Sequence, residues 1–143
     1  TSALAKRYVA ETGSNWIRGW IPRRAGHEII ISRLVTVELI AVAVRKLRDK
    51  TLTQSDFRRL RNNFYAHVRD QYQVIEFEPG VLSLSRQLLL KYPIRTLDSI
   101  QLASALRVGA NVRQALTFVA ADARLLAAAA AEGLPTDDPN LHP

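Results

Sequence analysis

Cysteine and methionine are both absent from this sequence of 143 residues. Without cysteine, the chain forms no disulfide and offers no thiolate to a metal ion, and nothing in it points to an oxidising compartment. We therefore expect a cytoplasmic protein. Because translation begins with methionine, we also expect that the sequence shown does not begin at the start of the gene product.

Long apolar runs are also lacking. The longest, Leu125–Ala131, is alanine-rich and much shorter than the roughly 20 residues that a membrane-spanning helix needs. No secretory leader, glycine-rich phosphate loop or serine nucleophile elbow is visible, and the three histidines are scattered. These absences argue against a membrane protein, a P-loop enzyme, a serine hydrolase and a histidine metal triad.

The sequence is rich in positive charge. Its net charge is +7, and arginine supplies 16 of the 20 basic residues. A planar guanidinium matches the geometry of phosphate, so the charge favours a nucleic-acid partner, although it also suits an acidic protein. The length and the 48% apolar content fit one soluble domain over residues 1–143.

Hydrophobic periodicity predicts helices that alternate with strands. The expected helices cover residues 2–10, 15–21, 36–49, 53–69, 79–92, 96–108 and 122–131. The expected strands cover residues 28–32, 72–77 and 115–119, with a short edge strand at 134–136. This order predicts a three-layer α/β/α domain with a central, mostly parallel sheet.

Three acidic residues occupy similar local positions. Glu38 follows the first predicted strand, Asp98 lies in the first turn of a helix, and Asp122 lies where the third strand gives way to the last helix. Ligands of open α/β sheets bind at the carboxyl ends of the strands. Glu38 and Asp98 each lie on an apolar face of their own predicted helix, and neither has a basic residue three or four positions later. Mg²⁺ or Mn²⁺ would be a suitable partner, since both prefer carboxylate oxygens.

If these three acids lie close together, their negative charges repel one another. Two carboxylates about 5 Å apart repel by roughly 3 kcal/mol at an effective dielectric constant of about 20. Three together would raise one pKa or recruit a cation. The alternative explanation requires no function, because acids near helix starts also stabilise helices by capping and by interaction with the helix dipole.

Four segments resemble the motifs of PIN domains of the VapC toxin type. Thr1–Tyr8 resembles the start of these domains just after their first strand. The pair Val37-Glu38, after Ile31–Leu34, resembles the second acidic motif. Leu97–Ala103 resembles the third and most specific motif, and Phe118–Leu125 resembles the fourth.

This resemblance implies an active site in which Glu38, Asp98 and Asp122 hold Mg²⁺ or Mn²⁺. It implies an endoribonuclease in which metal-activated water attacks a phosphodiester bond of RNA. It also implies the toxin component of a type II toxin–antitoxin system, which forms a homodimer and is inhibited by a cognate antitoxin protein. The basic residues nearest the acids in sequence, Lys6, Arg7 and Arg95, are candidates for RNA contacts.

One feature of the family is absent. Its first acid directly precedes the Thr-Ser pair at the end of a central strand, whereas this sequence begins at Thr1. We therefore expect the domain shown to be N-terminally incomplete, lacking the first central strand. A chain that truly lacked this strand would be expected to have little activity, because a domain has only about 5–15 kcal/mol of net stability.

Two alternatives remain open. A degenerate, non-catalytic PIN domain would bind RNA or regulate without cleaving it. A stable assembly with a partner protein is the other alternative, and it is suggested by Trp16 and Trp20, which share one helix face. Two core tryptophans would explain that pattern equally well.

Overall fold

The computed structural model describes residues 1–22, 25–112 and 115–142. Its first half contains α1 (Ser2–Ala5), α2 (Ser14–Trp20), β1 (Ile29–Ser32), α3 (Arg33–Arg48), α4 (Gln54–Asp70) and β2 (Tyr72–Ile75). Its second half contains α5 (Pro79–Lys91), α6 (Thr96–Gly109), β3 (Phe118–Val119), α7 (Ala123–Ala131), β4 (Thr136–Asp137) and the 3₁₀ turn η2 (Pro139–Leu141). This order of helices and parallel strands confirms the predicted α/β class.

Local signals account for several boundaries. Thr53 caps α4, where its hydroxyl oxygen accepts a hydrogen bond from the Asp56 amide at 3.1 Å. Gly133, with a φ of 87°, follows the end of α7. The first predicted helix was too long, because α1 ends at Ala5. Gly13 then turns the chain toward α2 with a φ of 79°, and a side chain there would collide with the Pro139 carbonyl group.

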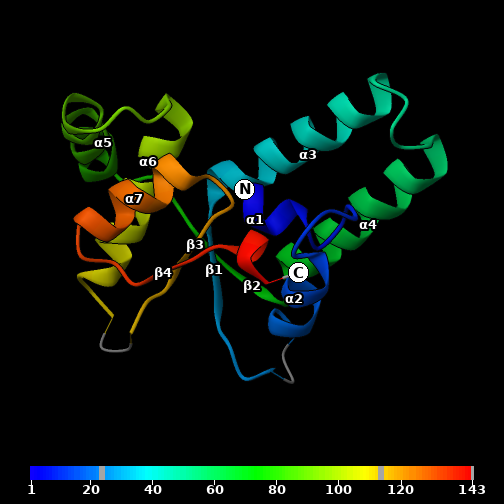
Figure 1. The fold of residues 1–143 in the computed structure, drawn as a ribbon, viewed down its shortest axis with the longest axis horizontal. Coiled ribbons are helices and arrows are strands. Elements are labelled where there is room, and N and C mark those ends of the chain that lie inside the picture. Colours follow the sequence, from blue (N-terminus) through cyan, green and yellow to red (C-terminus); the bar gives the residue numbers. More distant parts are fainter. Residues whose placement is uncertain (23–24, 113–114, 143) are drawn as a thin grey trace.

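The strands form two separate parallel pairs. β1 pairs with β2 from Ile29↔Tyr72 to Ser32↔Ile75, and β3 pairs with β4 from Phe118↔Thr136 to Val119↔Asp137. The predicted parallel direction is confirmed, while the predicted single sheet is divided into two halves in the part of the chain described here. β1 and β3 are the strands that face each other across the division (Figure 1).

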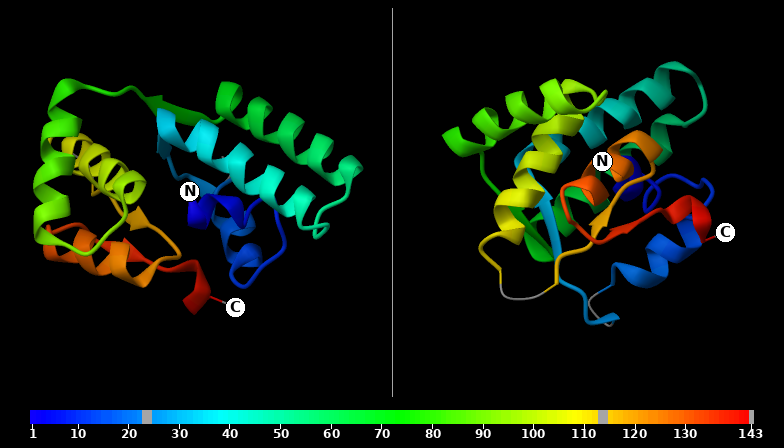
Figure 2. Two further views of the ribbon diagram at one scale, coloured as in Figure 1. Left: turned by 90° about the horizontal axis from the view of Figure 1, so that it is seen from above. Right: turned by 60° about the vertical axis from the view of Figure 1, so that its left-hand side comes forward.

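The hydrophobic core is divided in the same way. One cluster joins α1, α2, α3, α4 and the β1–β2 pair around Ile17, Leu39 and Phe64. The other joins α5, α6 and α7 around Leu88 and Leu102. Figures 1 and 2 show α5, α6 and α7 gathered on one side of the molecule and α3 and α4 on the other.

The two tryptophans stack on each other and on two histidines. The ring centroids of Trp16 and Trp20 are 5.4 Å apart, and His142 and His27 cover the outer faces at 4.3 and 4.4 Å. Both indoles also pack against the first core cluster. The predicted shared face is confirmed, but its rings are already engaged within the chain.

No described helix is long and apolar enough to cross a bilayer.

Candidate functional site

The three predicted acids come from three helices near the carboxyl ends of β1 and β3. Glu38 lies in the second turn of α3, directly after β1. Asp98 lies in the first turn of α6, and Asp122 is the N-cap of α7, three residues after β3. All three side chains are half-buried. Parallel strands place these positions at one edge of the molecule.

Glu38 is held by two side chains that are distant in sequence. The hydroxyl of Thr1 and the amide of Gln101 both donate to its Oε2. Gln101 also donates to the Thr1 hydroxyl at 2.9 Å and accepts from the Thr1 amino group at 3.1 Å. Gln101 was not predicted as a site residue, although its position three residues after Asp98 places both on one face of α6.

Asp98 lies in a buried and negatively charged environment. Burial raises its pKa above the usual 3.8, and the negative charges of Asp122 and Glu38 raise it further. The amino terminus and Arg95 act in the opposite direction. Within the described residues, no hydrogen bond or ion pair satisfies the Asp98 carboxylate. The charges of Glu38 and Asp122 therefore act on Asp98, as expected if the three acids share one site.

Asp122 combines a structural contact with its place near Asp98. Its Oδ1 accepts hydrogen bonds from the amides of Arg124 and Leu125, each at 3.0 Å. These bonds satisfy two of the free amides at the start of α7, so the side chain is fixed by the helix it caps. The capping explanation of Asp122 is thus correct, and it does not exclude a second role for Oδ2.

The donor chemistry of these residues fits a hard divalent cation. Glu38, Asp98 and Asp122 offer carboxylate oxygens, and among the described residues Asp98 has no hydrogen-bond or ion-pair partner that a cation would have to displace. They do not form a closed cage, since no group of three potential ligands within metal-binding distance occurs among the described residues.

The predicted RNA contacts differ in availability. Lys6 is only 5% exposed, and its ammonium donates to the Thr12 carbonyl at 2.9 Å. In this arrangement the Lys6 ammonium is not available to a phosphate group. Arg7 is half-buried and bonded to the hydroxyl of Tyr72 at 2.6 Å. Arg95, by contrast, is exposed at the N-cap of α6.

Arg7 belongs to a polar network that sequence reasoning missed. The Tyr8 hydroxyl lies 2.8 Å from Nδ1 of His67 and 2.7 Å from the Tyr72 hydroxyl. Burial, followed by the charge of Arg7, lowers the pKa of His67, and burial raises the pKa values of both tyrosines. The network therefore consists of neutral rings around one guanidinium, and it joins the segment after α1 to α4 and β2. Nothing in the spacing of these residues signals it.

Comparison with known proteins adds one match. The PIN domain family model matches residues 1–132, which includes every acid described above. A search of the curated proteins found no match.

Asp98→Asn should stabilise the metal-free protein at neutral pH. Because the folded-state pKa of Asp98 is raised, folding favours the protonated form, and ionisation destabilises the protein as pH rises above 3.8. The difference in unfolding temperature between variant and wild type should therefore be largest near about pH 7 and should shrink toward about pH 4. Thermal unfolding in EDTA tests this, with the exposed Glu28→Gln as control. A less stable Asp98→Asn at neutral pH would contradict it.

Proposed function

The chain belongs to the PIN domain family, whose members are generally nucleases and typically use divalent metals, and we propose that it is an Mg²⁺- or Mn²⁺-dependent endoribonuclease of the VapC toxin type. The carrying observation is the environment of Asp98: no hydrogen bond or ion pair satisfies this half-buried carboxylate among the described residues, and its pKa is raised by burial and then by the charges of Asp122 and Glu38. Isolated capping acids do not account for the effect of two neighbouring charges on Asp98. A shared cation does, because it reverses the sign of the interaction among the three charges.

Each site residue has a distinct part in this proposal. Glu38, Asp98 and Asp122 would hold the metal, which supplies an activated water and offsets charge on the phosphate. Thr1 and Gln101 orient Glu38 by donating to the same oxygen. The start of α7 fixes Asp122 through Oδ1.

Arginines are the proposed RNA contacts. Arg95 and Arg124 are exposed, and each lies within three residues of a site acid. Their positive charge would attract the phosphates of RNA to an edge that the carboxylates otherwise make negative. Lys6 and Arg7 form hydrogen bonds within the fold. Of the three predicted RNA contacts, we therefore propose Arg95.

Asp98→Asn and Asp122→Asn should each abolish metal-dependent RNA cleavage, with a loss of at least about 100-fold that corresponds to about 3 kcal/mol of transition-state stabilisation. Asparagine caps helices about as well as aspartate, so Asp122→Asn should retain stability, whereas Asp122→Ala should also lose about 1 kcal/mol. Cleavage of a labelled RNA, with and without EDTA, and urea unfolding measure the two effects. The exposed Asp49→Asn is the control.

Two results would contradict this assignment in different ways. Cleavage that survives both EDTA and Asp98→Asn would reject the metal site. Salt-dependent RNA binding without cleavage at any metal concentration would favour the degenerate, non-catalytic PIN domain instead.

Arg95→Ala should weaken RNA binding and its salt dependence. Loss of one phosphate contact should make the slope of log K against log salt shallower by about 0.7 for single-stranded RNA. Binding is measured in the Asp98→Asn background so that no substrate is cleaved. Arg58→Ala removes the same charge from an exposed position on α4 and should change the slope less. Equal effects of the two substitutions would show that Arg95 has no specific role.

We further propose that the protein is a cytoplasmic homodimer and that an antitoxin covers its acidic edge. An exposed stripe on α5 formed by Leu82, Leu89 and Leu90 supports the dimer, because positions separated by seven and eight residues lie on one helix face. Leu90 is 91% exposed, so it contributes little to the fold of the monomer.

Leu90→Asp should therefore convert the dimer to a monomer in sedimentation experiments. Leu141→Asp, at a position 77% exposed on η2, is the matched control and should leave the dimer intact. A wild-type monomer at micromolar concentration would argue against the dimer. Recovery of the protein without a small partner after expression of its native operon would argue against the antitoxin.

A further inference from the structure

The turn that follows α1, residues 6–9, is joined to α4 and β2 by side chains. The Arg7 guanidinium donates from Nη1 to the Tyr72 hydroxyl at 2.6 Å and from Nη2 to Nε2 of His67 at 3.3 Å. The Tyr8 hydroxyl lies 2.8 Å from Nδ1 of His67. His67 on α4 therefore contacts two consecutive side chains of this turn, one through each ring nitrogen.

The chemistry of arginine determines which nitrogen of His67 carries the proton. A guanidinium has N–H donors and no acceptor, so Nε2 must present its lone pair to Arg7. In the neutral ring the proton is then on Nδ1, which donates to the Tyr8 hydroxyl. Tyr8 in turn donates to the Tyr72 hydroxyl at 2.7 Å, and Tyr72 also accepts from Arg7. Each hydrogen bond of the network therefore has one direction.

The groups around His67 favour its neutral form. Burial, followed by the charge of Arg7 on the turn after α1, lowers the pKa of His67 below the usual 6.5. Asp70, on the same helix as His67, acts in the opposite direction. Tyr8 and Tyr72 contribute no charge, because burial raises their pKa values. The positive charge that faces the ring is therefore that of Arg7.

Water has access to this ring. His67 is half-buried and lines an open hollow of about 360 Å³ together with Arg7, Asp70 and Gln71. A proton can therefore reach the ring from solvent while the domain stays folded.

Protonation of Nε2 would remove one hydrogen bond of His67 and keep the other. Both ring nitrogens of a histidinium are donors. The Nδ1–H group could still donate to Tyr8, whereas the new Nε2–H group would face an N–H group of Arg7, and two positive charges would lie side by side. Acidification would therefore make the contact with Arg7 repulsive and leave the contact with Tyr8 intact.

This contact matters because the turn has few other connections to its neighbours. The backbone amides of residues 7–9 donate to carbonyl groups of α1, and the Arg7 carbonyl accepts from Nε of Arg18 at 3.1 Å. Among the residues that the structure describes, no backbone hydrogen bond joins the turn to α4 or β2. The side chains of Arg7 and Tyr8 therefore provide its hydrogen bonds to these two elements.

We propose that His67 is a pH-sensitive latch on the turn after α1. The neutral ring holds Arg7 and with it the turn against α4, and protonation at Nε2 breaks this contact and loosens the turn. The latch is separate from the acidic edge, because neither His67 nor Arg7 contacts Glu38, Asp98 or Asp122 in the part of the chain described here.

Nitrogen NMR of the histidine rings in the full chain tests the first half of the proposal. At about pH 8, the proton of His67 should lie on Nδ1, and Nε2 should have the shift of an acceptor nitrogen. In Arg7→Met, which removes the cation and keeps a side chain of similar reach, His67 should be protonated at a higher pH than in the wild type. A proton on Nε2 at neutral pH, or a midpoint that Arg7→Met leaves unchanged, would overturn the latch.

Hydrogen exchange tests the release of the turn. Between about pH 7.5 and about pH 5.5, the protection of the amides of residues 7–9 should fall at least about fivefold, after correction for the intrinsic pH dependence of exchange. In His67→Gln, the side-chain carbonyl can accept from Arg7 at either pH, so this fall should disappear.

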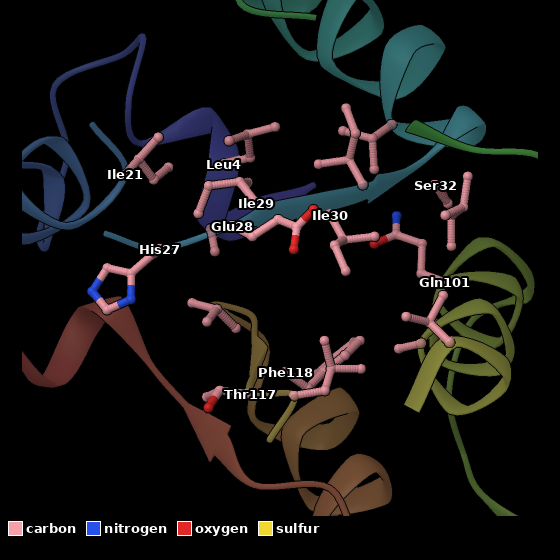
Figure 3. A pocket seen from close by; sticks show the side chains of 18 of the residues that line it. Leu4, Ile21, His27, Glu28, Ile29, Ile30, Ser32, Gln101, Thr117 and Phe118 are labelled. Atoms are coloured by element: carbon pink, nitrogen blue, oxygen red, sulfur yellow. The ribbon is translucent and has the colours of Figure 1, made fainter. Parts of the chain in front are cut away.

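His27→Gln is the matched control. His27 lies at one side of a different pocket, between β1 and β3 (Figure 3), where it stacks on Trp20 and has no hydrogen bond or ion pair among the described residues. This variant should lose protection on acidification as the wild type does. A fall of equal size in the wild type and in His67→Gln would show that His67 is not the latch. Neither measurement involves RNA or cleavage, so the outcome is independent of the proposed nuclease activity.

Discussion

Carboxylates repel one another, and parallel strands bring the sequence positions at their carboxyl ends to the same edge. These two facts together determine the character of this molecule. β1 and β3 run in the direction of their partners, and each leads into a helix that carries an acid, Glu38 on α3 and Asp122 at the start of α7. Burial raises the pKa of Asp98, and the charges of Asp122 and Glu38 that this topology brings near it raise the pKa further. Without a cation or a counter-charge, the arrangement is a cost to the fold.

The structure offsets part of that cost with local contacts that serve a second purpose. The amides of α7 bind Asp122, and the side chains of Thr1 and Gln101 bind Glu38. Each contact stabilises a negative charge with a fixed dipole, and each also fixes the position of a carboxylate. Asp98 alone has no such partner among the described residues. Asp98, the acid with the fewest hydrogen bonds, therefore lies near two carboxylates whose positions are already fixed.

Most of the fold was predictable because its signals are local. Thr53 and Gly133 mark the start and end of helices through contacts within a few residues, and the three isoleucines of β1 identify a strand without knowledge of its neighbours. The three acids were predictable for the same reason, since each follows a strand or begins a helix. The early end of α1 at Ala5 was not predicted, and the contact that requires glycine at position 13, before α2, involves Pro139, 126 positions later.

Contacts between residues that are distant in the sequence could not be predicted either. Gln101 reaches Glu38 and Thr1, and Tyr8 reaches His67 and Tyr72, across separations that no periodicity encodes. Lys6 illustrates the converse error. Its charge and its place in the sequence suggested a surface role, yet a carbonyl and the nearby Glu11 hold its ammonium within the fold. Charge predicts a partner only when the side chain is exposed.

Thr1 connects the fold to the site. Its hydroxyl binds Glu38, and its neighbour Ser2 is tied to the backbone beyond β3, so the same two residues join both halves of the molecule at the edge where the acids lie. A displacement of α1 would therefore move the Thr1 hydroxyl that positions the Glu38 carboxylate. In such a molecule, the stability of the core and the geometry of the acidic edge cannot vary independently.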